Sequence, residues 1–262
     1  LQGDDSWQFQ FPLRMPLKKW MNLRALHLAG TKLESLPNDI GKLLHLRYLD
    51  LSRSGLSMLP ESLTKLVNLQ TLHLYALDRL KELPRDLNRL VKLRVLDIAG
   101  CWSLKYMPDG MTSMTGLSTL PLFVVAQRDS SMKQQLEDLR ALSKLKGSLE
   151  IRIDKKFVYK KKEMNSRGGG YMSNKEYLNE IEINWFGGDE DENENEEDLL
   201  EDLQPHSNLR RLRIERYRGT KIPRWGIENN LATFLPKLVD ICISQCHGLQ
   251  SLPWLGKLQF LK

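Results

Sequence analysis

The sequence has few cysteines, no acceptor site for N-linked glycosylation and no long apolar run. Its three cysteines, Cys101, Cys242 and Cys246, are a sparse and odd-numbered set for a chain of 262 residues, and Asn-x-Ser/Thr does not occur. Secreted proteins usually carry paired cysteines or such acceptors. No apolar stretch approaches the about 20 residues of a membrane helix, and no secretion signal opens the chain. We therefore expect a soluble, intracellular segment.

Acidic and basic residues are unevenly distributed along the chain. The formal net charge is +6, from 39 lysines and arginines and 33 aspartates and glutamates. Ten acidic and no basic residues lie between Asp189 and Leu203, so the remainder carries 39 basic against 23 acidic residues, a net charge of +16. A basic surface of this kind can attract acidic partners of any class.

Two polar segments predict loops. Residues 187–198, GGDEDENENEED, are typical of a disordered acidic loop, and residues 154–173, with KKFVYKKK and RGGG, predict a flexible basic loop. The acidic loop is either a solvating segment or an intramolecular clamp on a basic surface of the same protein. A clamp would weaken as salt screens the charges.

A leucine pattern recurs from about residue 23 onwards. The segment LRALHLAGTKLESLP and three later segments share L-x-x-L-x-L, followed by L-x-x-L/M-P. The predicted strand centres, spaced by 23, 23, 24 and 24 residues, are Leu26, Leu49, Leu72, Leu96 and Leu120. This period is typical of leucine-rich repeats. Alternate residues of L-x-L point inward in a strand, so each repeat buries its leucines against its neighbours.

Each repeat also predicts a helical turn after its strand. The apolar segment before the turn ends at a proline, where a missing backbone donor is tolerated, and these prolines are Pro37, Pro60, Pro84 and Pro108. Apolar pairs three residues apart follow, and they are Ile40/Leu43, Leu63/Leu66, Leu87/Leu90 and Met111/Met114. Such pairs place one apolar face of a helical turn against the core.

The second half continues the pattern with longer repeats. Further strand centres follow Leu120 at spacings of 29, 32, 31 and 29 residues, and they are Leu149, Ile181, Leu212 and Ile241. Residues 130–146 carry a leucine at every third position from Leu136, with Gly147 behind them. This segment predicts an amphipathic helix that ends at a glycine and covers a convex flank.

We therefore predict an α/β fold, a leucine-rich-repeat solenoid shaped as a curved horseshoe. A short parallel β-sheet lines its concave face, and irregular turns or short helices line its convex face. Residues 1–22 form a ragged edge or partial repeat, residues 23–125 the regular repeats, residues 126–148 a helical insert and residues 149–262 the longer repeats. A further repeat starts at Leu261 without a cap, so we expect truncation at the C-terminus of a piece of a longer protein.

Histidines and aspartates alternate in one column of the predicted sheet. The column consists of His27, Asp50, His73 and Asp97. Adjacent strands lie about 4.8 Å apart, so each imidazole can meet a carboxylate. The two histidines are then about 10 Å apart, too far to share a zinc ion, and no nucleophile follows in the column. The column is either a solvated polar ladder or a recognition surface sensitive to pH between about 5 and 8.

Residues 209–219, LRRLRIERYRG, contain five arginines. Inward leucine and isoleucine positions leave Arg211 and Arg213 on the exposed face of one strand. Nucleic-acid binding would need basic residues continued along a groove with aromatic stacking partners, whereas the neighbouring strands offer Glu180, Glu182 and Asp240. We favour an ion-paired strand face that can also contact protein, since arginine is enriched at interfaces.

Candidate contacts for a protein partner lie on the exposed strand face. Tyr48 and Tyr75, with Trp185 near them in register, are possible aromatic anchors or ordinary surface aromatics. The candidates are Tyr48, Asp50, His73, Tyr75 and Asp97 in the regular half, and Arg211, Arg213 and Arg216 in the irregular half.

Two cysteines occupy a turn position that other repeats give to hydroxyl side chains. Cys101 and Cys246 stand just past their strands, where Thr31 and Ser54 stand elsewhere. A small polar side chain there can satisfy backbone groups of the turn. This placement predicts a structural role rather than a metal or redox role.

Several segments resemble a known family. Residues 203–225, LQPHSNLRRLRIERYRGTKIPRW, closely resemble the corresponding piece of plant disease resistance receptors of the coiled-coil, nucleotide-binding, leucine-rich-repeat class. LSTLPLFVV at residues 117–125, the helix and LKGSLEI that follow, and LPWLGKLQFLK at residues 252–262 support this resemblance. It implies an intracellular immune receptor whose repeats sense a pathogen effector and restrain a nucleotide-driven switch. The lysine- and glycine-rich segment after LKGSLEI departs from the family's usual stretch.

The resemblance also sets the expected ligands, partners and location. No G-x-x-x-x-G-K-[ST] phosphate loop occurs, so no cofactor is expected in this chain, and ADP or ATP is expected on an absent nucleotide-binding domain. Expected partners are a pathogen effector or guarded host protein, and an intramolecular contact with that domain. No catalytic or metal site is expected, and the location is cytoplasmic, with the nucleus as a second compartment. The alternatives are an intracellular repeat scaffold without a nucleotide switch and, less favoured, nucleic-acid binding with steep salt dependence.

Overall fold

A computed structural model of the chain describes residues 20–126, 132–159, 170–187, 196–226 and 230–251. The chain divides into two compact units, Leu1–Pro108 and Asp109–Lys262. Most of the predicted N-terminal edge, the repeat start at Leu261 and the middle of both predicted loops lie outside the described residues.

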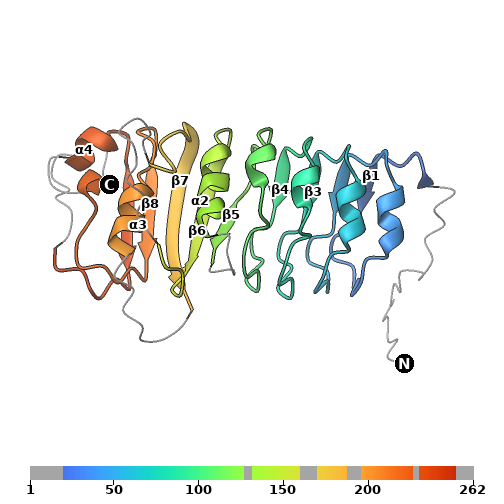
Figure 1. Cartoon of the computed structure of the whole chain (residues 1–262), viewed down its shortest axis with the longest axis horizontal. Helices are drawn as coiled ribbons and strands as arrows, with labels where there is room; N and C mark the ends of the chain where they lie inside the picture. Colours follow the sequence, from blue (N-terminus) through green and yellow to red (C-terminus); the bar gives the residue numbers. More distant parts are fainter. Residues whose placement is uncertain (1–19, 127–131, 160–169, 188–195, 227–229, 252–262) are drawn as a thin grey trace, which may run out of the picture. The chain divides into compact units, whose positions relative to one another are not determined.

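The first unit contains a four-stranded parallel sheet (Figure 1). Its strands follow chain order and are β1 (Ala25–His27), β2 (Tyr48–Asp50), β3 (Thr71–His73) and β4 (Val95–Asp97). Leu26 pairs with Leu49, and Leu49 pairs with Leu72. Leu72 in turn pairs with Leu96, so the first four predicted strand centres are confirmed. Leu49, Leu72 and Leu96 are fully buried, because they take the inward position of each strand.

Short 3-10 helices follow these strands along the chain. They are η1 (Asn38–Lys42), η2 (Glu61–Lys65) and η3 (Leu87–Arg89). Pro37 and Pro60 are extended immediately before η1 and η2, where the fixed φ of proline is suitable. The predicted apolar pairs are fully buried, for example Ile40 with Leu43. The predicted helical turn is therefore present in each of these repeats, in the tighter 3-10 form.

The turn that leaves each strand uses a left-handed backbone conformation. Its position, four residues beyond the strand centre, is occupied by Gly30 (φ 70°), Arg53 (φ 54°), Ala76 (φ 55°) and Gly100 (φ 73°) in the first unit, and by Arg216 (φ 57°) and Gln245 (φ 55°) in the second. The N–H groups of Gly30, Arg53 and Ala76 each donate to a carbonyl of the next repeat over 2.8 Å. These bonds extend the ladder beyond the strand ends and hold neighbouring turns together.

The second unit contains a five-stranded parallel sheet, also in chain order. Its strands are β5 (Leu122–Val125), β6 (Lys146–Asp154), β7 (Tyr177–Phe186), β8 (Arg211–Glu215) and β9 (Asp240–Ser244). Leu149 pairs with Ile181, Ile181 with Leu212, and Leu212 with Ile241, as predicted. The remaining elements are η4 (Met111–Ser113), α2 (Met132–Ala141), α3 (Glu196–Asp202), η5 (Arg224–Gly226) and α4 (Asn230–Phe234).

The predicted strand centre at Leu120 is wrong. The strand β5 starts at Leu122, and Phe123 lies opposite Ile151. Pro121 lacks a backbone N–H and cannot donate to a ladder, so the strand begins after it. All four residues of β5 are buried, and α2 packs against this strand on the side of the sheet that carries the other helices (Figure 1).

The predicted helix over residues 130–146 is present but shorter. Helix α2 ends at Ala141, and Lys146, the last residue of the predicted helix, belongs to β6. Gly147 (φ 80°) lies at a register irregularity of β6 instead of ending the helix. Burial of Leu136 and Leu139 confirms the apolar face of the helix.

Both segments predicted as loops are partly ordered and packed. The end of the acidic run forms α3, in which Glu196 is only 4% exposed, and residues 188–195 lie outside the described part. In the basic segment, Phe157 and Tyr159 are buried, and the Tyr159 hydroxyl donates to the Asp202 carboxylate. Parallel sheets, short helices and leucine cores in both units confirm the predicted α/β leucine-rich-repeat architecture.

Candidate protein-recognition surface

The histidine–aspartate ladder predicted for the first unit forms. It comprises His27, Asp50, His73 and Asp97, which follow one another across β1 to β4. The His27 Nδ1 and Asp50 Oδ2 atoms are 4.0 Å apart, and the His73 Nδ1 and Asp97 Oδ2 atoms are 3.2 Å apart. The other carboxylate oxygens accept hydrogen bonds from the backbone, Asp50 Oδ1 from Ser52 N (3.0 Å) and Asp97 Oδ1 from Ala99 N (3.2 Å). Each carboxylate is therefore anchored by one oxygen and faces an imidazole with the other.

Two tyrosines extend this surface. The Tyr48 ring lies 4.4 Å from the His27 ring and 5.6 Å from the His73 ring, measured between centroids. Tyr75 is exposed, and the Arg53 guanidinium lies 5.2 Å from its ring centroid. A flat guanidinium over a tyrosine face is a favourable cation–π arrangement. The structure therefore places Tyr48, Asp50, His73, Tyr75 and Asp97 on or beside the exposed face of one sheet.

The expectation that Trp185 lies at the surface, as an aromatic anchor or as an ordinary surface aromatic, is wrong. Trp185 is fully buried, and its ring lies 5.2 Å from that of Tyr217. Burial alternates along β7, and Trp185 shares the inward parity of Ile181 and Ile183. That two-residue period was visible in the sequence and would have placed the ring in the core.

The arginine-rich strand β8 is an ion-paired face, as favoured from the sequence. The Arg211 guanidinium lies 2.8 Å from one Glu180 carboxylate oxygen, and Arg213 Nε lies 3.6 Å from the other. Arg216 stands beyond the strand end, where its Nε donates to Gln245 Oε1 (2.8 Å) and an Nη donates to Asn184 Oδ1 (3.0 Å). Mixed charge on neighbouring strands suits a protein contact better than a continuous phosphate track.

Sequence reasoning missed a partly buried acidic pair on this face. Burial, together with the neighbouring Glu182 carboxylate, raises the pKa of Glu150 to about 7. Burial and Glu215 also raise the pKa of Glu182. Glu150 and Glu182 lie opposite each other on β6 and β7, so the predicted register contained the signal. The Arg152 guanidinium approaches Glu150 (3.9 Å) and covers the Phe186 ring (4.5 Å from its centroid).

Cys101 and Cys246 bond to backbone carbonyls near the turns, as predicted from their positions in the repeat. Thr31 Oγ1 donates to Leu28 O and Ser54 Oγ to Leu51 O, each over 2.7 Å. In the same place, the Cys101 thiol donates to Leu74 O (3.1 Å) and that of Cys246 to a carbonyl 3.2 Å away. Burial raises the pKa of Cys101 to about 11, which keeps it a thiol and a weak nucleophile.

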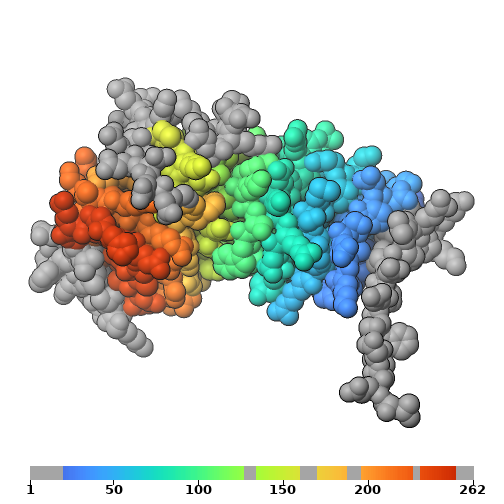
Figure 2. Space-filling view, turned by 90° about the horizontal axis from the view of Figure 1, so that it is seen from below, coloured from blue at the N-terminus to red at the C-terminus, as the bar shows by residue number. Residues whose placement is uncertain are grey.

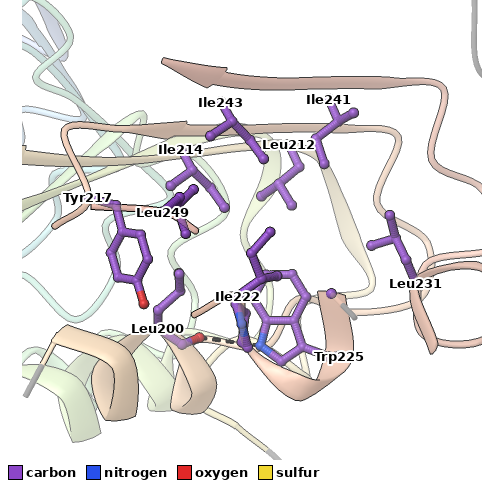
Figure 3. Close-up of a pocket in the computed structure, with 12 residues that line it drawn as sticks. Leu200, Leu212, Ile214, Tyr217, Ile222, Trp225, Leu231, Ile241, Ile243 and Leu249 are labelled. Atoms are coloured by element: carbon purple, nitrogen blue, oxygen red, sulfur yellow. Dashed lines mark hydrogen bonds between the residues drawn. The ribbon is translucent and has the colours of Figure 1, made fainter. Parts of the chain in front are cut away.

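An apolar hollow lies behind β8 and β9 (Figure 3). Figure 3 shows Leu212 and Ile241 near the Trp225 ring, whose Nε1 donates to Leu200 O (3.3 Å). Its volume of about 20 Å³ has room for about one water molecule, so it is core packing and not a ligand site.

Within the described ranges, no group of three or more His, Cys, Asp and Glu side chains is arranged to hold a metal ion. None of the helices that the structure describes has the length and apolar character needed to cross a membrane.

Leucine-rich turns stacked on parallel strands define a leucine-rich-repeat protein. The profile of the family described as "Leucine-rich repeat region" matches residues 8–262, and the chain belongs to this family. A solved leucine-rich-repeat protein of Leptospira interrogans shares the fold, with a TM-score of 0.55 and 20% identity over 88% of this chain and 51% of that one.

Curated relatives narrow the class further. The chain is 40% identical over 249 residues to "Disease resistance protein RGA2" of Solanum bulbocastanum, a match that covers 94% of this chain and 24% of the relative. It is 41% identical over 247 residues to RGA4 of the same species, with the same coverage of 94% and 24%. The predicted resemblance to the repeat region of plant nucleotide-binding, leucine-rich-repeat disease resistance proteins is confirmed. The chain spans about a quarter of these relatives, 24% of their length.

Proposed function

We propose that the chain is the protein-recognition region of a plant immune receptor, and that it detects a pathogen effector or a guarded host protein. The observation that carries this proposal is the ladder with its flanking tyrosines. Side chains from successive repeats share one exposed face there, while the leucines of the same strands are buried. Similarity to disease resistance proteins supports the immune context.

Differential binding is the proposed mechanism. A partner that contacts the exposed strand face binds one receptor state more tightly and shifts the balance between a closed and an open receptor. The closed state includes an intramolecular contact with a nucleotide-binding domain that holds ADP or ATP. The receptor acts in the cytoplasm, with the nucleus as a second compartment, and the repeat region itself performs no catalysis.

Conservative substitutions in the ladder test the recognition surface. Asp50→Asn with Asp97→Asn removes the charges that face the imidazoles but keeps an oxygen for Ser52 N and Ala99 N. Full-length receptor carrying these changes is compared with wild type by proximity labelling in infected leaf cells. We expect at least one infection-dependent partner to be recovered about tenfold less, since a charge-assisted bond is lost at each site.

Asp39→Asn is the matched control. Asp39 is an exposed carboxylate on η1 that pairs with Lys42 (2.8 Å), and it is not on a strand. The control should label the same partners as wild type. Equal labelling by wild type and the ladder variant would reject the ladder as the recognition surface.

A scaffold without a nucleotide switch is the competing function. Sequencing and translating the transcript upstream of Leu1 distinguishes this scaffold from the proposed receptor. A phosphate-loop motif between a strand and a helix supports the receptor, because that motif binds the nucleotide phosphates. A start codon with no such motif supports the scaffold.

A further inference from the structure

A row of exposed apolar side chains occupies one equivalent position in four successive repeats of the first unit. The row consists of Met21, Leu44, Val67 and Val91, which are spaced by 23, 23 and 24 residues. The centres of strands β1 to β4 have the same spacings, and each residue of the row stands five positions before the centre of its strand. Figure 2 shows these repeats lying against one another in chain order from the blue end. The name apolar row is used below for these four residues.

The apolar row is exposed although the residues beside it are buried. Its residues are between 45% and 54% exposed. The leucines that directly precede Leu44, Val67 and Val91 are fully buried. Isolated exposed leucines are ordinary, but a contiguous apolar patch marks an interaction surface. In the following turn Thr115 occupies the equivalent position, so the row is confined to the first unit.

Hydrogen bonds between repeats set the spacing of the row. The Arg47 N–H donates to Arg24 O and the Gln70 N–H to Arg47 O, each over 2.8 Å. The Asn68 side-chain amide donates to Leu44 O over 2.9 Å. These bonds tie neighbouring repeats together next to the row, so the spacing there stays near that of adjacent strands, about 4.8 Å. The four residues therefore extend over about 14 Å.

This spacing favours an α-helix as the occupant of the row. Successive turns of an α-helix rise by about 5.4 Å, whereas residues on one face of an extended strand recur at intervals of about 6.8 Å. The helix is the closer match to a spacing of about 4.8 Å. A helix of about ten residues, with one apolar side chain in each turn, covers the whole row.

Basic residues stand before and after the apolar row in the sequence. Three stand two positions before a residue of the row and three stand three positions after one, and they are Lys42, Lys65, Arg89, Arg24, Arg47 and Arg94. All six are exposed. Asp39 pairs with Lys42 (2.8 Å). Asp86 pairs with Arg89 (2.7 Å), so two of the six charges are already compensated.

Three of these cations are available to a partner. Arg24, Arg47 and Lys65 have no carboxylate partner among the residues that the structure describes. Glu61, at the other end of η2 from Lys65, accepts the Arg85 N–H instead (3.2 Å). Carboxylates beside the apolar face of a docked helix complement these cations, and such complementarity orients a partner.

We propose that the apolar row binds the apolar face of an acidic, amphipathic α-helix of a partner protein. A membrane surface fits less well, because side chains that bind membranes insert about 5 to 10 Å into the bilayer. The residues of the row are about half covered by their own repeats. The row lies outside the strands, so this contact is independent of the histidine–aspartate ladder proposed above.

A synthetic helical peptide of about 18 residues serves as the probe. It carries one leucine in each turn on one face and glutamate on both flanks of that face. A second peptide has the same composition with the leucines spread around the helix. Fluorescence anisotropy of each labelled peptide is titrated with the full chain. The first peptide should bind at least about tenfold more tightly than the second, since only the first has a continuous apolar face.

Polar substitutions of similar shape test the apolar row. Leu44→Asn, Val67→Thr and Val91→Thr together should weaken binding of the first peptide about tenfold or more, because apolar contact is lost at three positions. Met58→Gln is the matched control, since Met58 is 75% exposed in the same unit but lies outside the row. The control should change the affinity less than about twofold. Circular dichroism melting of each variant establishes that it is folded before it is titrated.

Arg47→Gln with Lys65→Gln tests the flanking charges. This variant should bind the first peptide more weakly, and its affinity should fall less than that of wild type between about 0.1 M and about 0.5 M salt, because salt screens exposed charges. Arg79→Gln is the control, since Arg79 is an exposed arginine that follows β3 and lies outside the row. Its salt dependence should equal that of wild type.

Equal binding of the two peptides, or equal losses in the triple variant and Met58→Gln, would overturn the proposal. Binding to phosphatidylserine vesicles that the triple variant loses would overturn it in favour of a membrane contact. The Asp50→Asn, Asp97→Asn variant should bind the first peptide as wild type does. Failure of this contact is therefore distinguishable from failure of the recognition surface.

Discussion

Lys175 offers a direct test of how the second unit is stabilised. Its side chain is only 1% exposed, and its Nζ donates to Leu139 O (2.7 Å) and Leu142 O (3.0 Å) at the C-terminal end of α2. Burial lowers the pKa of Lys175 to about 7. The Lys175 amine therefore donates to two carbonyls at the end of α2, one of which, Leu139 O, also accepts the Leu142 N–H (3.2 Å), and it does so in an environment that disfavours its charged form.

Substitution of Lys175 by methionine separates these two effects. Methionine keeps the apolar stem but leaves both carbonyls without this donor, which should cost about 2 to 4 kcal/mol when the wild-type amine is mostly neutral. The unfolded lysine titrates near about 10.4. The unfolded state therefore binds more protons than the folded state between pH about 7 and about 10.4, and wild-type stability rises with pH in this window. From pH 7 to pH 9 the gain relative to Lys175→Met should be about 2 kcal/mol.

Urea unfolding at pH 6, 7, 8 and 9, followed by circular dichroism, measures this difference. Subtracting the free energy of unfolding of Lys175→Met from that of wild type at each pH cancels the contributions of the other titrating groups. Lys237→Met is the control, because the Lys237 Nζ donates to Asn208 Oδ1 (2.7 Å) at an exposed site of the same unit. Its curve should run parallel to that of wild type. A constant difference between wild type and Lys175→Met from pH 6 to pH 9 would refute the lowered pKa.

Three further substitutions test the core, the acidic pair and the turn. Leu72→Ala, in a fully buried position of β3, should lower the free energy of unfolding by about 2 to 5 kcal/mol in urea titrations. Because the folded pKa of Glu150 is raised to about 7, wild type should lose about 2.5 kcal/mol relative to Glu150→Gln between pH 5 and pH 8, measured in the same way. Gly100→Ala should lower the melting temperature at a cost of about 1 to 2 kcal/mol, since the left-handed φ disfavours a side chain and the new Cβ would lie 3.3 Å from Ala76 Cα.

The sequence predicted those parts of the fold that depend on the leucine period. Burial of Leu49 and Leu72, and the pairing of Leu149 with Ile181, follow from inward positions that each repeat must fill. The predicted strand centre at Leu120 was wrong because Pro121 cannot donate a hydrogen bond to the sheet. The repeat period alone does not reveal such a local exception. At the end of the acidic run, Leu199 and Leu200 indicate an apolar helix face. The prediction of a loop rested on the high charge of the segment and therefore missed helix α3.

The histidine–aspartate ladder was predictable from the sequence, because its residues occupy the same position in successive strands. His73 and Asp97 are 24 residues apart, and a register based on the repeat was enough to bring them together. The grouping of Lys155, Arg216 and His247 beyond the strand ends of the second unit was not predictable in this way. Lys155, Arg216 and His247 lie after strands that longer repeats separate, and their meeting depends on where each turn leaves its strand. Only the three-dimensional turn geometry contains that information.

Both candidate sites occupy positions that the repeat core does not need. In the first unit they are outward strand positions, such as Asp50, whose neighbours Leu49 and Leu51 are fully buried. In the second unit they are turn positions beyond the strands, such as Arg216, where the backbone conformation is fixed and the side chain is not. Substitution at either kind of position changes the chemistry presented to a partner while the leucine core keeps its packing. The repeat thus separates the positions that stabilise the fold from the positions whose side chains are free to vary.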